Sequence, residues 1–435
     1  MRPAAPGSWS DVVIVCAAAP WHGARRLDHH LALGLSRYAP VLYVDPPTPW
    51  RATGFGPVVT GRNPRPSGPT PGLTMLDDRL ALLTPHVVGP HRRGLQGLAR
   101  RQMHRAVRHA VAALGHPRVR AVVVPTLDHH FGIFDGALQV LYVSDAFVAG
   151  TRLTLSPHRF ARELRRQPAQ ADLVVAASPA LADALRAGGH DPLLLPNGVD
   201  ADAFAATDQV PAAAGVWLEP PIAGYVGHLS SRVDVRHLRA VADRGHSVLL
   251  VGSCPRGSLD AELRGLLELP NVAWVGPRSF DELPSYLRHI DVGLVPYADT
   301  PYNRAVFSLT ALEHLAAGRP IVSTPTGSMT WLRDQHDART NPDTPLTARD
   351  LVIAAEPELF ADRVEQLFVA GRDEVSTARR RAAARSHSWT NRLATLAEAM
   401  GLADAEAIDR RPDLPSALPS APPSALPSAL EATPS

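Results

Sequence analysis

The chain of 435 residues is long enough for about two or three domains that each bury a substantial core. Its 44 basic and 42 acidic side chains leave a formal charge of +2, which excludes the strongly basic class of nucleic-acid-binding proteins. All the basic side chains in this count are arginine, because the sequence contains no lysine.

Cysteine usage and apolar runs indicate a cellular compartment. The two cysteines, Cys16 and Cys254, lie far apart and have the spacing of neither a disulfide framework nor a metal site. The apolar run at residues 11–19 is short and lacks the basic leader of a secretory signal peptide. No stretch is long enough to span a bilayer. These features predict a cytoplasmic protein.

The first half of the chain alternates strand patterns with helical spacing. Short apolar runs typical of buried parallel strands occur at residues 11–16, 41–44, 119–124, 138–143 and 171–176. Helical spacing follows the first and the last of these runs, and residues 73–83 hold one or two further strands. The alternation predicts a doubly wound parallel sheet. His129, His130 and Asp145 come just after two of the strands, on the edge where such sheets bind ligands.

The segment from residue 90 to residue 115 is the most polarised part of the chain. It combines an apolar stripe at helical spacing with no acidic residue and with six arginines: Arg92, Arg93, Arg100, Arg101, Arg105 and Arg108. One interpretation is a helix of the domain whose basic face meets solvent. The other is a surface that contacts a membrane of anionic lipids. The pattern leaves both open.

The second half begins a new series of strands at residues 222–226, 248–251, 271–275, 292–295 and 321–324. Around the last two, the pattern predicts a strand, a loop at 296–303, a helix beginning near Phe307 and another strand, which together make a βαβ unit. Backbone N–H groups at such a helix N-terminus attract phosphate. Glu313, about one and a half turns into the helix, is placed to accept hydrogen bonds from two ribose hydroxyls. The alternative is a solvated surface glutamate.

The second half resembles the donor-binding domain of GT-B-fold glycosyltransferases, of the bacterial family 1 and 4 types that include teichuronic-acid-biosynthesis enzymes. The resemblance rests on five pieces, in this order and spacing over residues 224–324: GYVGHL, NVAWVGP, LPSYL, DVGLVPY and LEHLAAGRPIVST. Upstream, PNGVD at residues 196–200 resembles the hinge between the two domains of these enzymes. The resemblance implies an α/β protein of GT-B architecture, in which two Rossmann-like, doubly wound parallel-sheet domains face each other across a cleft.

The resemblance also implies where the domains begin and end. An acceptor-side domain would occupy residues 1–195, and a nucleotide-sugar-binding domain residues 196–385. A C-terminal helix at residues 386–405 would cross back to the first domain. Residues 411–435 repeat Pro-Ser-Ala-Leu units, and proline at this density predicts a disordered tail.

By the same resemblance, nine residues would bind the nucleotide sugar: Gly227, His228, Arg232, Arg278, Arg304, Ser308, Leu309, Thr310 and Glu313. A glycine just past a strand lets the backbone approach phosphate oxygens, and the nucleobase would lie near residues 275–278. The chain departs from its relatives at Ser308 and Thr310, where they often carry proline and a phosphate-binding lysine. It also has Ala305 where retaining relatives carry glutamate. Arg232 and Arg304 are the candidates to replace the missing cation.

An inverting transfer requires a general base within reach of the acceptor hydroxyl. Asp145 is the first candidate, because relatives carry a comparable segment that opens on the cleft, and its alternative role is a helix cap. His129 and His130 are the next candidates, and His22 follows them. The sequence has no convincing DxD pair and no His/Cys cluster with metal spacing. The resemblance therefore implies chemistry without a metal ion or other cofactor.

The sequence predicts a glycosyltransferase of the hexosyltransferase type. It would transfer a sugar from a nucleoside-diphosphate-sugar donor to a glycan or lipid-linked acceptor in the synthesis of cell-surface polysaccharide or glycoconjugate. The expected location is cytoplasmic, with peripheral contact to the inner face of the plasma membrane through the arginine-rich segment. Two alternatives stay open. One is a GT-B-fold protein that binds nucleotide sugars without turnover, which Ala305 and Thr310 suggest, and the other is a sugar-nucleotide epimerase.

Overall fold

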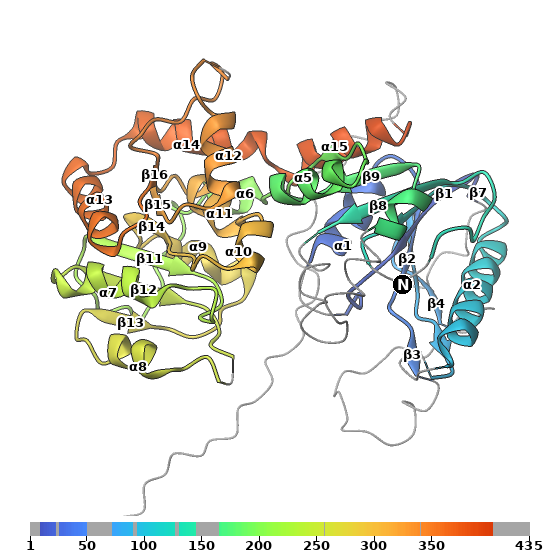
Figure 1. The fold of residues 1–435 in the computed structure, drawn as a ribbon, viewed down its shortest axis with the longest axis horizontal. Helices are drawn as coiled ribbons and strands as arrows, with labels where there is room; N and C mark the ends of the chain where they lie inside the picture. The colour runs from blue at the N-terminus through green and yellow to red at the C-terminus, as the bar shows by residue number, and fades with distance from the viewer. Residues whose placement is uncertain are drawn as a thin grey trace, which may run out of the picture.

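The computed structural model describes residues 9–22, 26–49, 72–89, 94–126, 130–144, 165–255, 257–339 and 341–402. These residues form two large β-sheets, each covered by helices, and the two layered halves lie side by side (Figure 1). The architecture confirms the predicted α/β class with two doubly wound halves. Several predictions fall outside the described residues, namely the tail at 411–435 and the residues Asp145, His129, Arg92 and Arg93.

The described residues of the first half form an eight-stranded sheet. Its spatial order is β10 (Leu193–Leu194), β9 (Leu173–Ala176), β8 (Leu138–Val143), β7 (Arg118–Val124), β1 (Asp11–Cys16), β2 (Val41–Val44), β5 (Leu80–Leu83) and β4 (Leu73–Met75). Neighbouring strands are parallel except β4 and β5, which are the strands predicted at residues 73–83. A separate small ladder joins β3 (Thr48–Pro49) to β6 (His86–Val87). The C-terminal parts of the central strands are apolar and buried because both faces of the sheet are covered.

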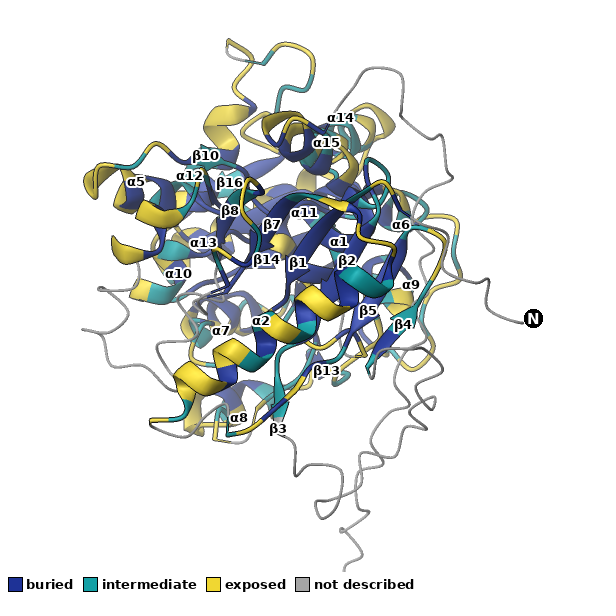
Figure 2. Ribbon diagram, turned by 90° about the vertical axis from the view of Figure 1, so that its right-hand side faces the viewer, coloured by how far each residue is buried: buried dark blue, intermediate teal, exposed yellow. Residues whose placement is uncertain are grey.

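Helices cover the two faces of the first sheet. On one face, α1 (Leu27–Leu35) packs against α15 (Trp389–Ala399), and on the other lies α2 (Gln96–Ala113), whose outer side is exposed (Figure 2). The contact between α1 and α15 is close at Gly34, where a Cβ atom would lie 1.9 Å from Leu393 Cδ1. A side chain there would displace Leu393, so the C-terminal helix packs closely against the first half of the molecule.

The described residues of the second half form a six-stranded parallel sheet. Its spatial order is β13 (Val272–Trp274), β12 (Ser247–Val251), β11 (Ile222–Val226), β14 (Val292–Val295), β15 (Ile321–Ser323) and β16 (Leu351–Ile353). The strand order reverses between β11 and β14, as in dinucleotide-binding folds. Its helices are α6 (Ala201–Ala205), α7 (Val235–Asp243), α8 (Ala261–Leu267), α9 (Leu283–Leu287), α10 (Pro301–Ala305), α11 (Leu309–Ala316), α12 (Gly327–Gln335), α13 (Pro357–Ala370) and α14 (Glu374–Ser386).

The structure differs from the sequence prediction just before α11. The predicted loop contains the short helix α10, because the Thr300 hydroxyl caps it by accepting a hydrogen bond from the Asn303 N–H (3.1 Å). The following helix, α11, begins at Leu309 instead of Phe307, because the Ser308 hydroxyl caps it. Phe307 therefore belongs to the approach to the helix and not to its first turn.

Within the described residues, the chain passes between the two halves twice, and the two crossings are bonded to each other. The Val199 N–H donates to the His387 carbonyl (3.0 Å), and the Trp389 N–H donates to the Val199 carbonyl (3.1 Å). At Gly198 an added Cβ atom would lie 2.7 Å from the Trp389 nitrogen, so this approach needs glycine. The segment that resembles a hinge is thus one strand of a two-stranded connection.

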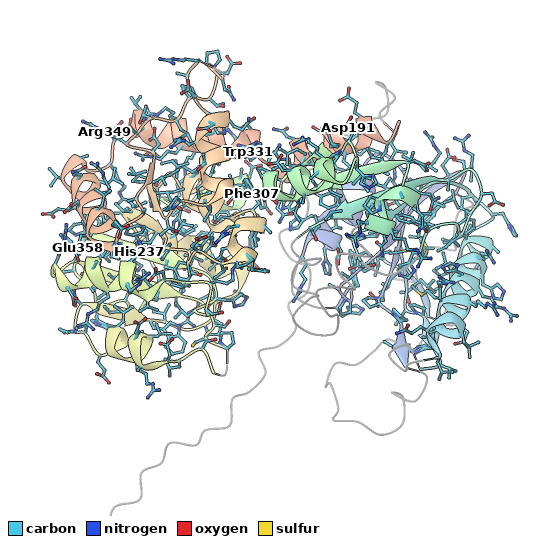
Figure 3. All side chains as sticks on the ribbon, in the orientation of Figure 1. Asp191, His237, Phe307, Trp331, Arg349 and Glu358 are labelled. Carbon is cyan, nitrogen blue, oxygen red and sulfur yellow. The ribbon has the colours of Figure 1, made fainter. Side chains whose placement is uncertain are left out.

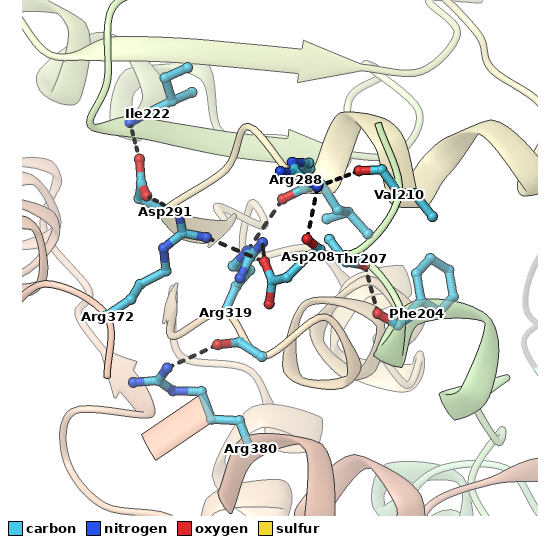
Figure 4. Close-up of polar contacts among 12 residues, drawn as sticks. Phe204, Thr207, Asp208, Val210, Ile222, Arg288, Asp291, Arg319, Arg372 and Arg380 are labelled. Carbon is cyan, nitrogen blue, oxygen red and sulfur yellow. Dashed lines mark hydrogen bonds and ion pairs between the residues drawn. The ribbon is translucent and has the colours of Figure 1, made fainter. Parts of the chain in front are cut away.

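Arginines fix the segment after the first crossing to the second half (Figure 4). Arg319, which is 1% exposed, donates to the Asp208 carboxylate (2.6 Å) and to the Leu287 carbonyl (3.3 Å). Burial by itself would raise the pKa of Asp208, but the hydrogen bonds and charges of Arg319 and Arg381 outweigh it and hold that pKa below its ordinary value. We infer that the residues after the hinge move with the second half.

The length and polarity of the helices in the described ranges show whether any of them could span a membrane. No helix there is both long enough and apolar enough to cross a bilayer.

Candidate active site

Two loops meet where the strand order of the second sheet reverses. They follow β11 and β14, whose carboxyl ends flank the place where open α/β sheets bind ligands. Backbone hydrogen bonds join the loops, because the Asp234 N–H donates to the Pro296 carbonyl (2.8 Å) and the Ala298 N–H donates to the Arg232 carbonyl (2.8 Å). The two loops thus form one connected surface at the switch point.

Glycines beside this surface leave the backbone free of side chains. Gly227, with φ of +154°, follows β11, and a Cβ atom there would lie 2.7 Å from the Tyr225 hydroxyl oxygen. Gly252, with φ of +143°, follows β12, and its Cβ atom would lie 1.9 Å from the Gly227 carbonyl oxygen. The Gly252 N–H donates to the Gly276 carbonyl (2.9 Å), just past β13. These close approaches require glycine, and they bring the loops after β11, β12 and β13 together beside the switch point.

The N-terminus of α11 lies at the same place. The Thr310 hydroxyl donates to the carbonyl of Val226, the last residue of β11, at 2.9 Å. The two predicted phosphate sites, the Gly227 loop and the start of α11, are therefore neighbours. Leu309, in the first turn, is 38% exposed, whereas Ser308 is buried. Because the Thr310 hydroxyl donates its proton to the Val226 carbonyl, it holds the helix to the strand and is not free to donate to a phosphate.

Glu313 lies one turn after Leu309 on α11. Its side chain is enclosed by protein and keeps only part of its surface in contact with solvent. No group of the described residues forms an ion pair or hydrogen bond with its carboxylate, and burial alone raises its pKa to about 7. A carboxylate held in such surroundings without a partner is typical of a binding site and not of a solvated surface.

The next residue, His314, has a buried basic side chain, whereas that of Glu313 is acidic. Its ring lies against Gly293 of β14, where an added Cβ atom would be 2.5 Å from the ring. Neither ring nitrogen has a partner among the described residues, and burial, with a smaller effect of the Arg319 charge, lowers its pKa to about 3. His314 therefore packs α11 onto the sheet as a neutral ring. Of the two titratable groups of α11, only Glu313 changes charge near neutral pH.

Arg232, in the loop after β11, is held by uncharged groups. Its guanidinium carbon lies 5.1 Å from the centroid of the Tyr297 ring and 4.8 Å from that of Tyr302. Its Nε donates to the Asn303 side-chain oxygen (3.1 Å), and the Asn303 amide donates back to the Arg232 carbonyl (2.9 Å). No sequence pattern pointed to these three partners. They fix the Arg232 guanidinium beside the switch point. This cation forms no ion pair with the described residues.

The other predicted polar residues have different surroundings. Arg304 is exposed and pairs with Asp299 (2.6 Å). Arg278 lies over the Tyr286 ring and donates to the Val275 carbonyl (2.7 Å), in the region expected to meet the nucleobase. His228 is exposed beside Gly227, and its Nδ1 shares a hydrogen bond with the Ser253 hydroxyl. Of the two candidates for the missing cation, Arg304 is therefore neutralised locally and Arg232 is not.

The structure describes only part of the acceptor side. Asp145 and His129 lie outside the described residues, so their roles stay predictions. His130 is 6% exposed, and His22, in the loop after β1, is exposed. Within the described ranges, no three His, Cys, Asp or Glu side chains gather closely enough to hold a metal ion.

The sequence of the chain is similar to a family model and to a curated protein. Residues 220–370 match the model of the family described as glycosyl transferases group 1. The putative teichuronic acid biosynthesis glycosyltransferase TuaH of Bacillus subtilis (strain 168) is 30% identical over 208 residues. This match covers 47% of the chain and 49% of TuaH, so the chain spans about half the length of this curated relative.

Solved structures resemble nearly the whole chain. Sucrose-phosphate synthase from Thermosynechococcus elongatus has a TM-score of 0.55 at 18% identity, over 90% of this chain and 96% of its own. HepE of Anabaena, in complex with UDP-glucose, has a TM-score of 0.59 at 14% identity, over 90% and 99%. At such identities the likeness concerns the fold. Residues 220–370 therefore match the model of the glycosyl transferases group 1 family, within a chain that has the GT-B fold.

Proposed function

We propose that the chain is a glycosyltransferase that transfers a sugar from a nucleoside-diphosphate-sugar donor to a glycan or lipid-linked acceptor. The proposal depends on Glu313, an enclosed carboxylate with no partner among the described residues, on the helix whose N-terminus adjoins Gly227. The family match and the name of TuaH support the class of reaction. HepE was solved with UDP and with UDP-glucose, which supports a nucleotide-sugar donor.

Each part of such a donor has a group to meet it. Two ribose hydroxyls would donate hydrogen bonds to Glu313, and these bonds favour its charged form. The diphosphate would lie over the Gly227 backbone and the start of α11, with Arg232 as its cation. The nucleobase would lie near Arg278. The charge of the leaving diphosphate would thus be stabilised by the protein without a metal ion.

The acceptor hydroxyl would attack the anomeric carbon of the donor sugar. The bond from that carbon to the diphosphate oxygen breaks, and the nucleoside diphosphate leaves with the electron pair. In an inverting reaction the proton of the hydroxyl passes to a base, for which Asp145 is the first candidate and His129 the second. Arg232 and the N–H groups of α11 act on the charge that develops on the leaving oxygen.

A donor screen tests the proposal. Purified full-length protein is mixed with UDP-, GDP- and ADP-sugars in a thermal-shift assay, and each mixture that raises Tm is analysed for products. A donor at 100 times its Kd should add about 3 kcal/mol of stability, and its sugar should be released as free sugar or transferred to an acceptor. A protein that neither shifts with any donor nor consumes one would contradict the proposal.

The same screen separates two alternatives. Two residues favour a protein that binds a donor without turnover. The Thr310 hydroxyl already donates its proton to the Val226 carbonyl. Ala305 has no charge, and its carbonyl accepts a hydrogen bond from Ser178 of the first half (2.6 Å). Such a protein would raise its Tm with a donor but consume none. A sugar-nucleotide epimerase would form a new nucleotide sugar from the donor alone, without any acceptor.

We also propose that α2 attaches the enzyme to the cytoplasmic face of a membrane. The helix lies on the side of the first half away from the second sheet (Figures 1 and 2). All four arginines of α2 are exposed. Arg108 donates to the Ile133 carbonyl (3.2 Å), and the other three are Arg100, Arg101 and Arg105. Nearby apolar side chains are exposed as well, Leu98 at 45% and Val88 at 43%. Cations beside apolar groups suit a surface of anionic lipids.

Removing the charges of Arg100, Arg101 and Arg105 tests the membrane proposal. The Arg100→Gln/Arg101→Gln/Arg105→Gln variant should bind vesicles of phosphatidylcholine and phosphatidylglycerol about 10- to 100-fold more weakly than the wild type in co-sedimentation. An Arg186→Gln/Arg239→Gln/Arg333→Gln variant loses the same charge elsewhere and should bind like the wild type. Equal binding by the two variants would contradict the role of α2.

A further inference from the structure

A row of aromatic rings leads from the candidate site to the hinge. Phe307, just before the cap of α11, meets Trp331 of α12 edge to face, with 5.7 Å between ring centroids. Trp331 meets His387 of the second crossing in the same way at 5.9 Å. Phe307 and Trp331 lie together where the second half borders the first (Figure 3). The row joins three segments that are far apart in the sequence.

The site end of the row is tied to Glu313. Phe307 is 4% exposed and is followed directly by Ser308, whose hydroxyl accepts the Ala311 N–H (3.3 Å) and caps α11. The Phe307 ring and the first turn of α11 are therefore adjacent through Ser308. Glu313 lies one turn farther along the same helix.

The hinge end of the row is tied to both halves. Arg392 of α15 donates to His387 Nδ1, so His387 Nε2 carries the proton and donates to His336 Nε2 (2.7 Å). His336 donates from Nδ1 to the Thr344 carbonyl (2.6 Å). Both rings are satisfied as neutral imidazoles, and burial lowers the pKa of each. His387 thus connects α15, in the first half, with the residues that follow α12.

We propose that Trp331 is a positioning residue that couples the angle between the two halves to the geometry of the donor site, an inference that rests on the proposed function. A rotation of the halves about the two crossings moves the His387 ring. Packed interiors change between discrete arrangements and do not deform continuously, so Trp331 passes that shift to Phe307 and the cap of α11. By reciprocity, a nucleotide bound at α11 favours one angle between the halves.

A double-mutant cycle on nucleotide binding tests the coupling. Calorimetric titration gives the Kd of UDP, GDP or ADP, whichever the donor screen selects, for the wild type, Trp331→Leu, His387→Ala and the double variant. We expect each single substitution to weaken binding about 3- to 10-fold. The double variant should bind the nucleotide no more weakly than whichever single variant binds it less tightly. The reason is that both substitutions interrupt the same row of aromatic rings.

Further variants separate coupling from damage to the fold. Trp331→Phe keeps a ring between Phe307 and His387 and should bind within about 2-fold of the wild type. Trp217→Leu alters a side chain that is 63% exposed and should bind like the wild type. Should Trp331→Leu fail to fold, Trp331→Met takes its place in the cycle.

Two results would overturn the coupling. One is a pair of single effects that multiply in the double variant, and the other is unchanged binding by a Trp331→Leu protein with the wild-type Tm. A wild type that binds none of the three nucleotides would instead overturn the proposed function, and the coupling with it.

Discussion

The Glu313→Gln variant should lose about 100- to 1000-fold in kcat/KM for the nucleotide sugar while keeping its fold. In the proposed complex the carboxylate accepts hydrogen bonds from two ribose hydroxyls, and hydrogen bonds to a charged group contribute about 1.5–3 kcal/mol each. An amide has no charge and offers one acceptor oxygen, so the variant should lose about 3–4 kcal/mol of transition-state binding. Initial rates of donor consumption measure the loss.

The same substitution should stabilise the ligand-free protein, and more so at higher pH. Burial raises the pKa of Glu313 from 4.5 to about 7. The stability gained from the protonated carboxyl is complete below pH 4.5 and is lost as the pH rises through about 7. Glutamine has no such loss. Allowing for the partial solvent contact of the side chain, the variant should be about 1–3 kcal/mol more stable than the wild type at about pH 8 and nearly equal to it at about pH 4.

Urea unfolding at both pH values measures this difference. Glu358→Gln is the matched control, because its side chain on α13 is 81% exposed and its loss should change stability by less than about 0.5 kcal/mol. A stability difference for Glu313→Gln that stays constant with pH would mean that the carboxylate is solvated. Full activity in that variant would remove Glu313 from the site.

The convergence of Gly227 and Glu313 could be predicted because apolar patterns locate strand ends. β11 and β14 are buried on both faces, so each is a continuous apolar run in the sequence. Parallel topology then places their carboxyl ends on one edge, together with the loops that follow. The start of α11 was predicted less well, because Phe307 has the apolar spacing of the helix although Ser308 caps it.

Polar contacts between distant segments could not be predicted in this way. Arg232 and Asn303 are 71 residues apart, and neither local sequence indicates their hydrogen bond. The helix α14 escaped prediction for a related reason. Its arginines resemble a solvated face, yet Arg380 is 3% exposed because it pairs with the buried Asp350 (2.8 Å). Such pairs reverse the usual tendency of charged residues to lie outside.

Arg232→Gln should reduce kcat/KM by about 100- to 1000-fold, whereas Arg304→Gln should change it by less than about 3-fold. Arg304 pairs with Asp299 and its side chain is 62% exposed, so water and salt screen its charge. Arg232 lies in the loop after Gly227, and the rings of Tyr297 and Tyr302 fix its guanidinium group. Removing one fixed donor to a developing negative charge typically costs about 3–4 kcal/mol. Equal losses in the two variants would contradict the assignment.

A rescue variant distinguishes a lost cation from a damaged loop. Thr310→Lys, in the Arg232→Gln background, introduces the lysine that the family resemblance leads us to expect at this position, and it returns a positive charge from the α11 side. It gives up the hydrogen bond to Val226, worth about 1 kcal/mol, and lysine lacks the fork of arginine, so we expect a partial recovery of about 10-fold in kcat/KM. If Arg232→Gln fails because the loop has lost its anchor at Asn303, its Tm falls as well and the lysine restores nothing. Recovery of activity at an unchanged Tm would therefore mean that Arg232 contributes a positive charge at the diphosphate.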